Sequence, residues 1–357
     1  MTHIIYKVAL TLILATGMAS CDVHEWPHIE YGEVNSLLTI SFETSLPLYR
    51  EITYARGGNS ISWESLYQYD IRYIISVCHT GTRNEARRYT ITKPYDGQLD
   101  HTVTLPLDEG TWDIYIWADY VDAFSTADRY FNTADFANIT YSDPKNYTGS
   151  TDTREAFRGM TTISVTHPDR FLDSQPKPSY HAKVDMMRPM GRYEVLSTDV
   201  EEFLTRVTEM RTREAQTKAD ARQAEDTKAD ADTRVNIDEF RVIFRYNAFM
   251  PYSFNMFTDK PADSWTGISY VSQMALVDEG MLLGFDYVLV NGSETTMNVN
   301  IEVYDSDGTL LSITRGIEIP IVRNKLTIVK GEFLTSSAQG GVSINPGYDG
   351  DDYNIPI

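Results

Sequence analysis

Apolar and polar residues alternate along most of this chain, with the period of two that is typical of half-buried β-strands. The clearest run is TWDIYIWADY, in which Trp112, Ile114 and Ile116 would share one face of a strand and Tyr115 and Trp117 the other. We expect further strands at 37–42, 71–77, 101–105, 160–165, 182–195, 239–246, 282–290, 297–304, 310–319 and 325–333.

One stretch has a helical period instead. Its large apolar residues are spaced three or four apart, so the predicted helix packs by one face, and Asp199 stands where a helix cap is expected. These apolar residues are Phe203, Leu204, Val207 and Met210. The following segment, 211–234, has no large apolar residue and predicts either a solvated extension of the helix or a disordered insert.

The order of these elements predicts the fold class. Helices and strands do not alternate, which argues against a parallel α/β sheet. We therefore expect an all-β chain with one helix, built as two tandem antiparallel β-sandwich domains. The first domain would span 36–197 and the second 235–340, with the helix and polar insert at 198–234 between them and a tail at 341–357.

The first 20 residues have the features of an export signal. Lys7 precedes the apolar run VALTLILA, which is shorter than the ~20 residues of a membrane-spanning helix but fits the core of a signal peptide. Small residues then stand before Cys21, as in a lipobox, where cleavage between Ser20 and Cys21 would leave Cys21 to be acylated. The alternative is an ordinary secretory signal cut near Ala19. Residues 21–35 would form a tether.

Charge and cysteine content narrow the class of protein. The formal net charge is −20, and an acidic surface repels phosphate, so we expect no nucleic-acid partner. Only two cysteines occur. If Cys21 carries lipid, Cys78 has no partner within the chain, and its apolar surroundings predict a buried free thiol.

Candidate chemistry is sparse. Acidic side chains that would suit Ca²⁺ occur in the loop-like stretch 122–159 and near the end of the strand before it. No EF-hand spacing is present, and a solvated loop is the favoured interpretation. These acids are Asp119, Asp122, Asp128 and Asp135. No nucleophile elbow, zinc motif, P-loop or Cys-x-x-Cys is present, so we expect a protein that is not an enzyme and has no metal or cofactor. A glycosidase with two carboxylates far apart in sequence is left open.

Three runs resemble a known family. The segment IPIVRNKLTIVKGEFLT at 319–335 and the following GVSINPGYDG resemble the last core strand and the end of Bacteroidales fimbrillin-like proteins. The run CDVHEWP, which begins at Cys21, resembles the start of related lipoproteins, including FimB-type fimbrial anchors. The resemblance implies two transthyretin-like sandwiches at the outer membrane surface. It also implies assembly by strand donation, in which a strand of one subunit fills an open position in another.

In polymerising subunits of that family an arginine-specific protease opens the position for the donated strand. Arg56, just before Gly57-Gly58, is the candidate for such a cut in this chain, although a plain turn is the favoured interpretation of this stretch. An anchor subunit would instead keep its lipidated end. The polar insert at 211–234 departs from the family pattern and leaves the junction between the domains open.

These observations favour a structural or adhesive lipoprotein on the cell surface, a fimbrial anchor or accessory subunit. Its partners would be membrane lipid, through acylated Cys21, and other surface subunits. The alternative is a glycan-binding surface lipoprotein in which Tyr115 and Trp117 stack on sugar rings. The favoured expectation is that both rings instead pack under the loop-like stretch 122–159, because large aromatic side chains are usually buried. Exposure or burial of the two rings distinguishes the hypotheses.

Overall fold

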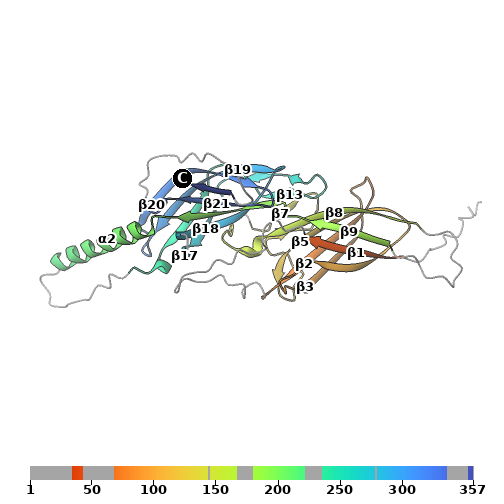
Figure 1. Cartoon of the computed structure of the whole chain (residues 1–357), viewed down its shortest axis with the longest axis horizontal. Helices are drawn as coiled ribbons and strands as arrows, with labels where there is room; N and C mark the ends of the chain where they lie inside the picture. The colour runs from red at the N-terminus through yellow and green to blue at the C-terminus, as the bar shows by residue number, and fades with distance from the viewer. Residues whose placement is uncertain are drawn as a thin grey trace, which may run out of the picture.

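The protein is described by a computed structural model that covers residues 34–42, 68–143, 145–166, 180–221, 235–277, 280–335 and 353–356. The predicted sites at Ser20, Cys21 and Arg56 lie outside these ranges. Two β-rich regions follow one another along the long axis of the molecule, and helix α2 (Val200–Ala221) projects from one end (Figure 1). The predicted all-β class with one helix is confirmed for the described residues.

Two sheets face each other in the N-terminal region. One has the strand order β4-β1-β9, formed by β1 (Val34–Phe42), β4 (His101–Leu107) and β9 (Tyr180–Met186). The other has the order β3-β2-β5-β8, formed by β2 (Tyr69–His79), β3 (Glu85–Pro94), β5 (Gly110–Asp122) and β8 (Ala156–Val165). Trp112, Ile114 and Ile116 point from β5 into the core between these sheets, as their alternation predicts.

Two further sheets form the C-terminal region. The first has the order β17-β18-β10-β21-β22, with bounds Ala275–Val277, Gly280–Leu289, Met190–Ser197, Leu326–Gly331 and Tyr353–Pro356. The second has the order β16-β11-β19-β20, with bounds Ser269–Gln273, Arg241–Tyr246, Glu294–Tyr304 and Leu310–Val322. Most neighbouring strands are antiparallel, but the pairs β1–β9, β10–β21 and β21–β22 are parallel.

Small sheets join the two regions. Strands β6 (Phe131–Asn132), β7 (Ile139–Tyr141), β13 (Ser253–Asn255) and β14 (Lys260–Pro261) form one of them, and β12 (Met250–Pro251) pairs with β15 (Ser264–Trp265) in another. Short 3₁₀ helices occur at η2 (Asp152–Arg154) and η3 (Ile237–Glu239). The first small sheet lies over β5 on the side away from the N-terminal core, so β5 is buried on both faces.

Strand β10 pairs differently from our expectation. The sequence suggests that the N-terminal domain ends at residue 197, which would include β10. In the structure β10 lies between β18 and β21, far along the chain, and every residue of the strand is buried. We therefore propose that the domain boundary lies at 187–189, between β9 and β10.

Helix α2 packs as its sequence pattern predicts. Phe203 and Val207 are buried, and the Phe203 ring meets that of Phe240 edge-on at 5.1 Å between centroids. The helix continues to residue 221, and residues 212–214 and 216–218 are exposed, as expected for a solvated extension, whereas Arg211 pairs with Glu239 and Asp305. Residues 222–234 lie outside the described part of the chain. No described helix is both long enough and apolar enough to span a membrane.

Asp199 stands immediately before the helix, as predicted, but its carboxylate has a different role. Its backbone carbonyl accepts the Phe203 N–H at 3.0 Å. Its side chain instead accepts hydrogen bonds from the backbone N–H groups of Leu334 and Thr335, at 3.1 and 2.7 Å. Asp199 thus fixes the segment that follows β21 against the base of the helix.

Candidate functional site

The first described strand occupies a central position in its sheet. β1 pairs antiparallel with β4, from Val34–Leu107 to Ile40–His101, and parallel with β9, from Ser36–Tyr180 to Phe42–Met186. Leu38 of β1 is 1% exposed and belongs to the N-terminal core. Removing β1 would leave unpaired backbone groups on two strands and a vacancy in the core, which is the geometry that a donated strand fills.

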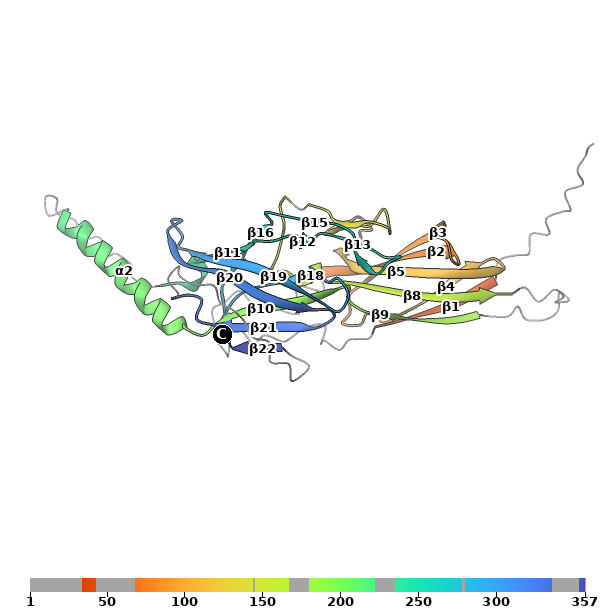
Figure 2. The same cartoon turned by 90° about the horizontal axis from the view of Figure 1, so that it is seen from above.

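The last strand has a weaker attachment. β22 runs parallel to β21, from Thr327–Tyr353 to Lys330–Pro356, at the edge of its sheet (Figure 2). Among the described strands, β22 has one neighbour in its sheet, β21, whereas β1 has two. A strand held along one edge loses fewer backbone hydrogen bonds on leaving than one held along both edges.

A buried polar cluster joins the two regions. Arg154 of η2 forms an ion pair with Asp286 of β18, and both side chains are at most 3% exposed. The hydroxyls of Tyr147 and Tyr246 donate to the same carboxylate at 2.8 and 2.6 Å. Burial raises the pKa of Asp286, while the charge of Arg154 and the two tyrosine hydrogen bonds act in the opposite direction. These contacts join a loop of the N-terminal half to the C-terminal sheet.

Further ion pairs hold the connector between β9 and β10. Arg188, in this connector, pairs with Glu155 and donates to the Asn324 side chain at 3.2 Å. The carbonyl of Arg188 accepts from Arg323 at 3.2 Å. Because the connector is bonded from both sides, the relative position of the two regions is fixed by specific contacts rather than left to a free linker.

Sequence reasoning missed this cluster, although a signal was present. Asp286 interrupts the apolar run MLLGFDYVLV. Arg192 and Glu194, which form a largely buried ion pair at 2.8 Å, interrupt MGRYEVLS in the neighbouring strand β10. A charge within a strand that is otherwise apolar is seldom buried without a partner of opposite sign. Such interruptions could have indicated paired buried charges, but not which residues pair.

The proposed glycan platform is wrong. Tyr115 is 8% exposed and Trp117 is fully buried, so neither ring has a free face. Trp117 packs edge-on against Phe131 at 5.2 Å, and Tyr115 packs edge-on against Phe257 at 4.9 Å. The reason is that the small sheet around β7 and β13 covers this face of β5.

The acidic residues considered for calcium have other partners. Asp119 is buried and accepts from Arg72 at 2.7 and 2.9 Å, and Asp128 accepts from the same guanidinium at 2.9 Å. Asp122 pairs with Arg129 at 2.9 Å. Asp135 accepts the N–H of Ala137 at 2.8 Å. Among the described residues no group of acids, histidines or cysteines is arranged to hold a metal ion.

The free thiol at Cys78 is confirmed. Its side chain is fully buried in β2 and forms no disulfide in the described structure. Burial raises the pKa of the thiol, which keeps it protonated and unreactive.

Comparisons with solved structures give distant matches. The fimbrial anchor protein Mfa2 of Porphyromonas gingivalis is 7% identical, covers 79% of this chain and 82% of its own, and has a TM-score of 0.37. The tip fimbrial protein Mfa3 of the same organism is 11% identical, with 80% and 81% covered and a TM-score of 0.34. A protein of Bacteroides eggerthii proposed to act in cell adhesion is 10% identical, with 91% and 95% covered and a TM-score of 0.40.

No curated protein matches the sequence. A family model does match, and it extends over both β-rich regions, from residue 32 to residue 357. The chain therefore belongs to this family, which is described as a family of unknown function (DUF6562).

Proposed function

We propose that this protein is a structural or adhesive subunit of the cell surface, a fimbrial anchor or accessory lipoprotein tethered to the outer membrane through acylated Cys21. The observation that carries the proposal is the central position of β1 between β4 and β9. Only 12 residues separate Cys21 from Val34, so at ~3.4 Å per residue the membrane lies within about 45 Å of the sheet. A pull on the domain would be resisted by hydrogen bonds along both edges of β1.

Strand donation is the second part of the proposal. A cut after Arg56 would separate β1 from the rest of the chain and leave β4 and β9 with facing, unpaired edges. The terminal strand of a neighbouring subunit could then enter that position. In its own sheet β22 pairs with one strand, β21, whereas at the β1 position of a neighbouring subunit it would pair with two, β4 and β9. The additional pairing favours transfer between subunits. In an anchor subunit β1 would stay in its sheet. Such a subunit could donate its own β22 but would accept no strand at the β1 position.

A glycan-binding role is the alternative, and a different residue pair now supports it. Trp265 of β15 is 38% exposed, and its ring lies 5.4 Å from that of Tyr252, at 76°. The carboxylate of Asp263, also exposed, lies beside the Tyr252 hydroxyl at 3.4 Å. An aromatic corner next to a carboxylate offers both stacking and hydrogen bonding to a sugar.

Mass spectrometry of the protein from native membranes tests the proposal. We expect an acylated N-terminus at Cys21, loss of membrane attachment in Cys21→Ala, and fimbrial subunits in the purified material. A mature N-terminus at Gly57 would instead identify a processed, polymerising subunit. An unmodified N-terminus elsewhere, on protein free of the membrane, would contradict the anchor. Binding to a glycan array that is lost in Trp265→Ala would support the alternative.

A further inference from the structure

Phe124 is displayed in water by a strained turn. The residue follows β5, and its side chain is 96% exposed. The Ser125 N–H donates to the carbonyl of Asp122 at 3.0 Å and closes a four-residue turn in which Phe124 is third, with φ of 62°. Because φ is positive at the third residue and not at the second, Ala123, the turn matches type II, in which the third position favours glycine. Placing phenylalanine there costs backbone strain as well as exposing apolar surface.

The turn is held by side-chain contacts on both sides. The Phe124 N–H donates to the side chain of Asp70 at 2.9 Å, and Asp70 is buried. On the other side Asp122 pairs with Arg129, whose guanidinium lies over the Tyr69 ring at 4.2 Å. Backbone strain and exposed apolar surface, which both lower stability, therefore coincide at Phe124, whose backbone is anchored to Asp70. Such exceptions occur where a side chain serves a contact rather than the fold.

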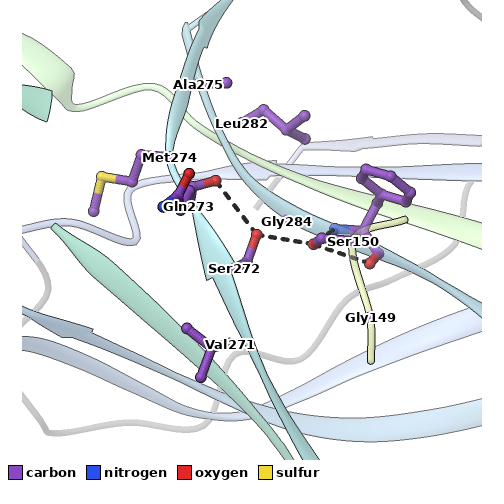
Figure 3. Close-up of a pocket in the computed structure, with 10 residues that line it drawn as sticks. Gly149, Ser150, Val271, Ser272, Gln273, Met274, Ala275, Leu282 and Gly284 are labelled. Carbon is purple, nitrogen blue, oxygen red and sulfur yellow. Dashed lines mark hydrogen bonds between the residues drawn. The ribbon is translucent and has the colours of Figure 1, made fainter. Parts of the chain in front are cut away.

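A cavity of about 230 Å³ opens where β16 of the C-terminal region ends and β17 begins, and Gly149 and Ser150 of the loop before η2 complete its wall (Figure 3). Its walls are uncharged, and half of its lining residues are apolar. These apolar residues are Val271, Met274, Ala275, Leu282 and Phe285. A cavity of about 150 Å³ is enough to take up a benzene molecule, so this one has room for a phenyl ring.

The hydroxyls in the cavity wall are already bonded to the protein. Ser150 Oγ and Ser272 Oγ lie 2.8 Å apart, and the Phe285 N–H donates to Ser150 Oγ at 3.1 Å (Figure 3). An apolar group can therefore enter without depriving these two hydroxyls of their partners. Val271 is 55% exposed and offers apolar surface to an incoming ring.

We propose that Phe124 of one copy of this chain inserts into the Val271–Phe285 cavity of a second copy. Both complementary parts are present on the same chain, one on the N-terminal and one on the C-terminal region. Copies that each carry a charge of −20 repel one another, so contact is favoured where the facing side chains are uncharged. A projecting residue and a cavity at different places produce a head-to-tail contact, which repeats into an open row of copies.

This contact uses neither β1 nor β22, so it stands or fails independently of strand donation. It would place copies side by side on a surface where tethering makes them concentrated. The same argument predicts a dependence on salt, since screening of the like charges strengthens the association.

Sedimentation velocity of the mature chain tests the proposal. Protein concentrations up to roughly 0.1 mM allow association with a Kd of about 0.1 mM to be detected. We expect concentration-dependent association that increases with salt. Phe124→Gly should abolish it while leaving the fold as stable or more so, because glycine accepts the positive φ. Val271→Glu should also abolish it by placing a charge at the cavity. Phe249→Ser removes another exposed phenylalanine (69%) and should have no effect.

A mixing experiment gives the sharpest result. Phe124→Gly keeps an intact cavity, and Val271→Glu keeps an intact phenylalanine, so an equimolar mixture should form one-to-one pairs and nothing larger. Each variant alone should remain monomeric. The proposal is overturned if the wild-type chain stays monomeric in high salt, if Phe124→Gly associates like the wild type, or if the mixture forms no pairs.

Discussion

The ion pair between Arg154 and Asp286 allows a quantitative test of how the two regions are joined. Replacing Arg154 by methionine keeps much of the side-chain volume but leaves the Asp286 carboxylate buried without its positive partner. Breaking a buried ion pair in this way costs about 3–5 kcal/mol. Since Nη2 of Arg154 has no hydrogen-bond partner among the described residues, the wild-type pair is incompletely satisfied there, and we expect a value near the lower limit.

The pH dependence identifies the cause of that loss. Burial already raises the pKa of Asp286 in the wild type, and loss of the Arg154 charge raises it further. A carboxyl whose pKa is higher in the folded than in the unfolded chain (~3.9) stabilises the fold when protonated, and this stability is lost as the pH rises through the folded pKa. The difference between Arg154→Met and wild type should therefore be largest near neutral pH and decrease towards about pH 4.

Urea denaturation followed by tryptophan fluorescence measures both effects. Arg154→Met combined with Asp286→Asn should recover most of the lost stability, because no charge is then buried alone. Arg213→Met breaks an exposed helical ion pair with Glu209 and should cost less than about 0.5 kcal/mol. A loss below about 1 kcal/mol at pH 7 for Arg154→Met, or one that does not change with pH, would refute this reasoning.

Three other predictions concern single sites. Asp199→Ala removes the acceptor for the Leu334 and Thr335 N–H groups; we expect a loss of about 1–3 kcal/mol and faster hydrogen exchange of those two amides, with unchanged exchange counting against the role of Asp199. Leu38→Ala leaves a cavity beside β1, and thermal denaturation should show a loss of about 2–5 kcal/mol; a smaller loss would mean that β1 contributes little to the core. Cys78 should resist maleimide labelling in the folded protein and react fully in urea, whereas rapid labelling under native conditions would contradict its burial.

The sequence predicted those features that depend on neighbouring residues. Alternation in β5 correctly separated Trp112, Ile114 and Ile116 from Tyr115 and Trp117, because successive side chains of a strand must point to opposite faces. The three- and four-residue spacing of apolar side chains located α2 for the same kind of reason. Burial of Cys78 followed from the apolar run around it.

Only the tertiary structure decided what covers each face. Trp117 packs against Phe131 of β6 and Phe254 of β13, and Tyr115 packs against Phe257 just after β13. Strand β13 lies more than a hundred residues further along the chain, so no local pattern reports its presence. For the same reason β10 belongs with β18 and β21. The charge of Asp286 interrupts an apolar run in the sequence, and it is compatible with a buried position only because the folded chain brings Arg154 beside it.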